Sequence, residues 1–72
     1  QEATRRMHAL LNSALDETER VVFTMHYGDD VPLEAITRAL RLENASGAKA
    51  YIVSAKRKLG RAVERLKARG AH

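Results

Sequence analysis

The sequence predicts an all-α domain of four helices. Apolar residues recur at spacings of three and four along the 72 residues, and no segment alternates as a strand does. Short stretches rich in Gly, Asp, Pro or Asn interrupt this periodicity. A chain of this length supports one domain, and without cysteine it has neither a disulfide nor a thiolate metal site. We therefore expect a single domain over residues 1–72 with one small core.

The first two helices are expected on either side of Asp16. Asp16 precedes Glu19 by three residues and an apolar run follows, which is the spacing of a capped helix start. We expect the second helix to bury Val21, Val22 and Met25, and Gly28 to end it in a left-handed conformation. The apolar stripe of the first helix consists of Met7, Leu10, Leu11, Ala14 and Leu15.

A short third helix and a long fourth helix should follow. Pro32 suits the first turn of a helix over about residues 32–41, because its missing N–H has no partner there. After a break at residues 42–47, Asn44 and Ser46 are candidate N-caps of the last helix. Gly60 should bend or fray that helix. One narrow stripe on it is expected to face the core: Ala48, Ile52, Ala55, Leu59, Ala62 and Leu66.

Positive charge gathers in the last third of the chain. Residues 1–48 hold five Lys or Arg against eight Asp or Glu, a net charge of −3. Residues 49–72 hold eight against one, a net charge of +7. Such a basic segment on an acidic body indicates a polyanion or an acidic surface as the partner, although a solvated helix face has the same composition.

Several function classes do not fit this sequence. The longest apolar run is four residues (50–53), which is too short for a membrane span or a signal peptide. His8, His26 and His72 are too scattered for a metal site, and a domain of this size leaves no room for an enzyme cleft. We therefore expect a binding module without enzymatic activity, cofactor or metal.

A short helix, a tight break and a basic helix with small residues in its first turns are the parts of a helix-turn-helix. In that module the second helix lays its first turns against the base edges of duplex DNA, and bulky side chains would hold it away. The residues expected to contact DNA are Lys49, Ala50, Val53, Ser54, Lys56, Arg57 and Arg61 on the last helix, with Arg38 and Arg41 at the end of the third.

These candidate contacts divide by chemistry. Lys49, at the start of the last helix, is the first candidate for the groove. Ser54 would hydrogen-bond a base edge, and Ala50 would touch a thymine methyl group. The remaining cations are better placed for phosphates, which fix the register of a protein on DNA without reading its sequence.

Two stretches carry a family resemblance. They read ALLNSALDETERVVFTMHYGDDVPLEAITRALRL and SGAKAYIVSAKRKLGRAV. Over residues 10–66 the chain resembles region four, the C-terminal DNA-binding domain, of bacterial RNA polymerase sigma factors, especially the extracytoplasmic-function group. The matching positions are Arg20, Val22, Phe23 and Gly28, then Glu34, Ile36 and Leu40, and on the recognition helix Lys49, Ile52, Ala55, Lys56 and Leu59.

The chain also departs from that family pattern. Asp16 replaces a proline and supplies a cap instead. Thr37 stands where the family has alanine, and Arg41 where it has glycine in the turn. One extra residue lies between Leu40 and Ala55, and we expect it in the turn.

The resemblance implies a function in transcription initiation. It implies binding to the minus-35 element of duplex promoter DNA and to RNA polymerase core through the beta-subunit flap, with an anti-sigma protein as a further possible partner. It implies a cytoplasmic protein with no membrane partner, and a fragment of a longer chain. Two alternatives stay open: the effector domain of a response regulator, and a helical protein-interaction module with a basic docking helix.

Overall fold

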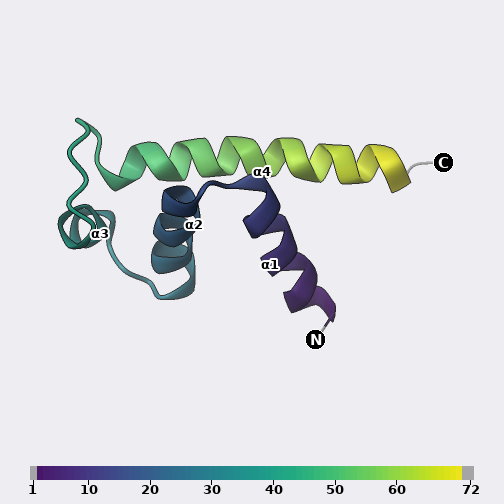
Figure 1. Cartoon of the computed structure of the whole chain (residues 1–72), viewed down its shortest axis with the longest axis horizontal. Helices are drawn as coiled ribbons and strands as arrows, with labels where there is room; N and C mark the ends of the chain where they lie inside the picture. The colour runs from purple at the N-terminus through teal and green to yellow at the C-terminus, as the bar shows by residue number, and fades with distance from the viewer. Residues whose placement is uncertain (1, 71–72) are drawn as a thin grey trace.

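The computed structural model describes residues 2–70, which form four α-helices (Figure 1). Helix α1 spans Glu2–Ala14, α2 spans Glu17–Phe23, α3 spans Leu33–Ala39 and α4 spans Ala48–Gly70. A π-helical turn, η1 (Thr24–Gly28), continues α2 directly. No strand occurs within residues 2–70, so the all-α prediction is confirmed. Gln1, Ala71 and the third histidine, His72, lie outside the described residues.

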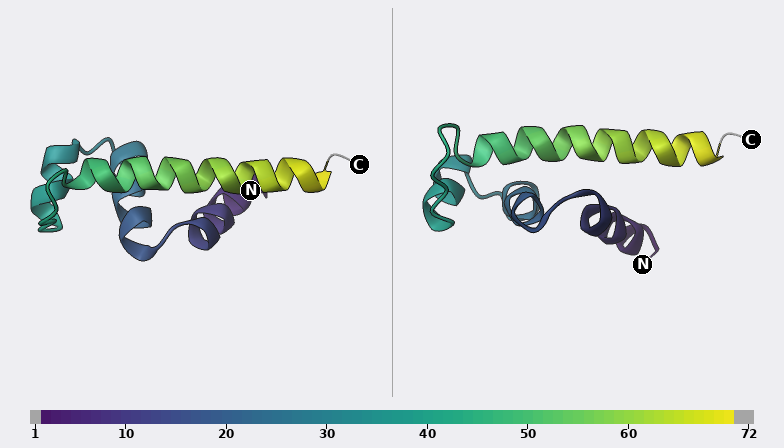
Figure 2. Two further views of the ribbon diagram at one scale, coloured as in Figure 1. Left: turned by 90° about the horizontal axis from the view of Figure 1, so that it is seen from above. Right: turned by 45° about the horizontal axis from the view of Figure 1, so that its top comes forward.

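The molecule is elongated along α4, which is its longest helix with 23 residues. The principal extents are 45 × 26 × 16 Å. Helix α3 lies at the N-terminal end of α4, α2 crosses beside its first half, and α1 runs away from it farther along (Figures 1 and 2). All three shorter helices therefore contact α4, although α1 does so only near its C-terminal end.

The core consists of two adjoining clusters, and α4 contributes to both. Helix α1 and the residue that follows it meet α4 in the second cluster, whereas α2 and α3 meet it in the first. Phe23 packs against both clusters. The buried members are Val22, Ile36, Ala48 and Ile52 in the first cluster, and Leu11, Leu15 and Ala55 in the second.

The predicted core stripe of α4 holds only in its first half. Ala48, Ile52 and Ala55 are buried, and Leu59 and Ala62 are half-buried, although Ala62 belongs to neither core cluster. The placement of Leu66 in the core is wrong: its side chain is 54% exposed, because α1 leaves an open groove at that end of α4. The fraying expected at Gly60 does not occur, since α4 continues through this residue to Gly70.

Helix α2 begins as predicted but ends differently. Asp16 Oδ1 accepts a hydrogen bond of 2.8 Å from the Glu19 N–H, and Glu19 Oε1 accepts one of 2.9 Å from the Asp16 N–H, which completes a capping box. Val21 is 37% exposed rather than buried. Gly28 closes the π-helical turn without a positive φ, and the left-handed conformation falls on Asp30 (φ 57°) instead.

Helix α3 is shorter than predicted at both ends. Pro32 is its N-cap, with extended backbone, and the helix ends at Ala39. Arg41 then adopts a left-handed conformation with φ 53°. The backbone therefore takes a glycine-like conformation at the position where the family resemblance expects glycine.

A side chain of α3 caps α4, which corrects the prediction of Asn44 or Ser46 as the cap. Thr37 Oγ1 accepts a hydrogen bond of 2.9 Å from the Ala48 N–H and donates one of 2.8 Å to the Leu33 carbonyl. Asn44 donates its Nδ2 to the Gly47 carbonyl instead. The departure from alanine at position 37 thus supplies a hydroxyl that ties the start of α4 to α3.

Candidate nucleic-acid interface

The first half of α4 presents one face to solvent opposite its core stripe. Ala50, Val53 and Arg57 follow one another at helical spacings of three and four, which places them on the same side. All three are exposed, and Val53 is 56% exposed. We call these three residues the outer face. Lys49 is exposed at its edge, one residue before Ala50.

Lys56 lies on the flank of α4 that meets η1. Its Nζ stands 5.6 Å from the centre of the Tyr27 ring, a cation–π arrangement. Tyr27 also packs on Phe23, with 4.7 Å between ring centroids. Lys56 and Arg61 are both exposed: Lys56 lies beside the outer face, whereas Arg61, four residues after Arg57, continues the same side of the helix one turn farther along.

Arg38 and Arg41 are exposed at the end of α3 and just beyond it. Arg38 lines a shallow depression of about 330 Å³ between α3 and the segment that leads into α4. Arg41 does not line this depression. The structure thus brings Arg38 near the start of α4, where Lys49 also lies, and places Arg41 in the turn.

The predicted orientation of Ser54 is wrong. Ser54 is half-buried, and its Oγ donates a hydrogen bond of 2.5 Å to Glu19 Oε2 on α2. One helical step of about 100° separates it from Val53 and turns its side chain toward α2. Because the Ser54 hydroxyl donates to a buried carboxylate, it is not available to hydrogen-bond a base edge.

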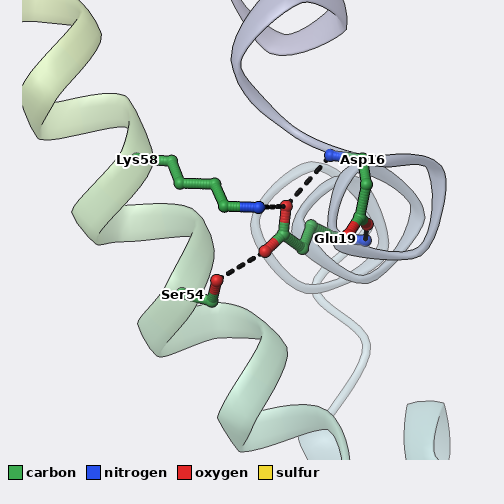
Figure 3. Close-up of polar contacts among 4 residues, drawn as sticks. All are labelled: Asp16, Glu19, Ser54 and Lys58. Atoms are coloured by element: carbon green, nitrogen blue, oxygen red, sulfur yellow. Dashed lines mark hydrogen bonds and ion pairs between the residues drawn. The ribbon is translucent and has the colours of Figure 1, made fainter.

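Glu19 is the polar centre of the fold, and only its capping role is predictable from the sequence. Its side chain is 3% exposed. Figure 3 shows that Oε2 accepts from Ser54, whereas Oε1 accepts from Lys58 Nζ at 2.8 Å and from the Asp16 N–H. The partners on α4 are 35 and 39 residues away in the chain, so no local spacing signals them.

The environment of Glu19 favours its charged form. Burial alone raises the pKa of this carboxyl group, but the hydrogen bonds from Lys58, Ser54 and the Asp16 N–H outweigh it. The pKa of Glu19 therefore lies below its ordinary value of 4.5. The charged carboxylate fixes the rotation of α4 about its axis, with Ser54 and Lys58 toward α2 and the outer face toward solvent.

A second surface lies at the other end of α4. Arg6, Ala9, Leu10 and Ser13 of α1 face Leu66 across an open, mainly apolar groove of about 610 Å³. An adjacent depression of about 300 Å³ is lined on α4 by Lys58, Arg61, Ala62 and Arg65. This groove was not predicted, because Leu66 continues the apolar periodicity of the buried stripe.

Comparison with protein-family models, with curated proteins and with solved structures gave no match. Within residues 2–70, no three His, Asp or Glu side chains lie close enough together to hold a metal ion. None of the helices in that range is long and apolar enough to cross a membrane. Function is therefore inferred from the charge, shape and exposure of these surfaces together with the sequence resemblance.

Proposed function

We propose that this chain is a DNA-binding module of the sigma-factor region-four type, which recognises the minus-35 element of promoter DNA. The observation that carries the proposal is the outer face of α4. It exposes two small apolar side chains, Ala50 and Val53, between the cations Lys49 and Arg57. Small side chains between cations suit a helix that must approach base edges while it neutralises phosphates.

In this proposal α3, the turn and α4 act as a helix-turn-helix. The first turns of α4 enter the major groove, which is about 12 Å wide and admits an α-helix. Helix α3 crosses the DNA backbone, where Arg38 and Arg41 reach phosphates. Farther along α4, Lys56, Arg57 and Arg61 make the remaining phosphate contacts. The bond from the Ala48 N–H to Thr37 supports this assignment, because it couples the two helices of the motif.

The assignment to sigma factors comes from the sequence resemblance. Matching positions take roles that a shared fold requires: Val22, Ile36 and Ile52 are buried together. The proposal includes binding to RNA polymerase core through the beta-subunit flap and control by an anti-sigma protein. The module would act in the cytoplasm by binding alone, without catalysis.

A second candidate function is supported by the groove between α1 and α4. Its apolar lining and the neighbouring Arg61 and Arg65 would suit an acidic helical segment of another protein. In that case the basic helix docks on a protein rather than on DNA. Only the DNA-binding function predicts that the chain binds duplex DNA and that substitutions on the outer face weaken this binding.

A salt titration with labelled duplex DNA separates the two. Contacts with about five phosphates give a slope near −4.5 in a plot of log K against log salt concentration. We expect Lys49→Ala and Arg57→Ala each to weaken binding and to reduce the slope by about one. Lys67→Ala, an exposed change in the last turn of α4, is the matched control and should leave both quantities unchanged.

The DNA-binding proposal is contradicted if duplex DNA binds no more tightly than heparin and neither outer-face variant changes the affinity. For the polymerase contact, the assay is retention of purified bacterial RNA polymerase core on the immobilised chain. Retention supports the sigma-factor assignment, and its absence, together with specific duplex binding, contradicts that assignment alone.

A further inference from the structure

We infer that Ala50 and Val53 read thymine methyl groups, so that the preferred duplex carries two neighbouring thymines where α4 enters the major groove. This inference rests on the proposed DNA binding and names what the outer face recognises. It differs from the sequence-based expectation, in which Ala50 was paired with a hydrogen bond from Ser54.

The exposure of Val53 has no explanation in the packing of the fold. It is 56% exposed, and neither core cluster includes it. Valine is also a weaker helix former than most residues, because its branched side chain loses rotamer freedom against the preceding turn. A solvated helix face therefore gains nothing from valine at this position, whereas an apolar contact with a partner does.

The chemistry of the outer face indicates which group of a base pair it contacts. Ser54, the nearest hydroxyl, donates to Glu19 and points toward α2. Ala50 and Val53 offer only apolar surface. In the major groove the thymine 5-methyl group is the apolar feature of the base edges, whereas the others are hydrogen-bond donors and acceptors.

The spacing of the two side chains fits two neighbouring bases. Residues three apart on a helix have Cβ atoms about 5–6 Å from each other. Bases on one strand rise about 3.4 Å per step and are displaced sideways by the twist of the duplex. Lys49 and Arg57 lie before and after the pair in the chain, so both can reach phosphates while the apolar pair meets the bases.

The test begins with selection of preferred duplexes from a random pool by the whole chain. Each thymine of the selected site is then replaced in turn by deoxyuridine, which removes only the methyl group. We expect deoxyuridine at two neighbouring positions to weaken binding about fourfold each, the effect of one buried methyl group. Val53→Ala removes the two γ-methyl groups and should reduce the response at one of these positions while it leaves the other unchanged.

Val63→Ala is the matched control, because Val63 is also an exposed valine of α4 but lies beyond the outer face. It should keep the full response at both positions, and circular dichroism should show unchanged helix content for both variants. If the chain selects a duplex and depends on Lys49 and Arg57, but deoxyuridine has no effect, the thymine inference is overturned and the DNA-binding proposal stands.

The inference is equally overturned if Val53→Ala responds to deoxyuridine as the unaltered chain does. If no duplex is preferred over heparin, both the inference and the proposed function fail. The outcomes are therefore distinguishable.

Discussion

At the scale of single residues, Gly47 shows how closely the start of α4 approaches α3. Its backbone is left-handed (φ 57°), and a Cβ atom there would stand 2.6 Å from Thr37 Oγ1 and 2.8 Å from Thr37 Cγ2. Thr37 cannot move away without losing its hydrogen bond to the Ala48 N–H. Both the backbone and the space at position 47 therefore require glycine.

Gly47→Ala should lower the free energy of unfolding by about 2 kcal/mol, from backbone strain and the clash with Thr37. Urea denaturation followed by circular dichroism measures this change. Gly60→Ala is the matched control, because Gly60 lies inside α4 and an added Cβ would meet no atom within 4 Å apart from the neighbouring residues and backbone of its own helix. That variant should gain up to about 1 kcal/mol from helix propensity. Equal effects at the two positions would contradict the structure around Gly47.

Two further residues show what sequence patterns miss at this scale. Asp30 and Arg41 both take left-handed conformations, whereas the sequence pattern predicted this conformation at Gly28. Glycine often indicates a left-handed conformation, which other residues rarely adopt. Its presence does not prove that conformation, however, and other residues can still adopt it. The π-helical turn after α2 moves the chain reversal past Gly28, and no local signal distinguishes that turn from an ordinary helix end.

At the scale of elements, α2 and α4 are joined by the charged carboxylate of Glu19. Because its pKa is lowered in the folded state, folding releases protons from this group, and its contribution to stability is complete above pH 4.5. The contribution declines as the pH falls through the lower pKa of the folded protein. Acid should therefore weaken the contact between α2 and α4.

Glu19→Gln should lower the free energy of unfolding at pH 7 by about 1–3 kcal/mol, because the ion pair with Lys58 is replaced by a weaker hydrogen bond to an uncharged amide oxygen. It should also flatten the loss of stability below pH 4.5, since glutamine does not titrate. Chemical denaturation at a series of pH values between 3 and 7 tests both effects. Glu64→Gln, an exposed change on α4, should leave the stability and its pH dependence as they are. A steep acid dependence in the Glu19 variant would contradict the assignment.

Features that depend on residues close together in the chain could be predicted from the sequence, whereas features that depend on distant residues could not. The capping box and the stripe from Ala48 to Leu59 depend on residues three or four apart, and both were predicted. The cap that Thr37 supplies to α4 and the bonds of Ser54 and Lys58 to Glu19 join residues far apart in the chain. Periodicity correctly predicted that Ala50, Val53, Arg57 and Arg61 are exposed opposite the core stripe. It placed Ser54 there wrongly, since it does not show on which flank of α4 helix α2 lies.

At the scale of the whole molecule, stability is distributed unevenly along α4. Its first half contacts three other helices, whereas residues 63–70 are all exposed and beyond both core clusters. Backbone amides open most readily where few apolar contacts hold them. The last two turns should therefore open without disturbing the rest.

Hydrogen exchange followed by NMR should show this gradient directly. We expect amides of residues 64–70 to exchange at least about tenfold faster than those of residues 52–59, relative to their unfolded rates. The amides of α2 around Val22 are an internal control and should match the slow group, because Val22 is fully buried against α4. Uniform protection along α4 would mean that its distal half has a packing partner in solution.

The position of α4 at the end of the described chain also affects how the protein folds during synthesis. Each core cluster lacks an α4 member until that helix has been made: Ala48 and Ile52 in one, Ala55 in the other. The first three helices leave the ribosome with Leu11, Val22 and Ile36 still exposed to water. Completion of the core consequently waits for α4, and a ribosome that stalls before residue 52 holds a chain in which neither cluster has all its buried members.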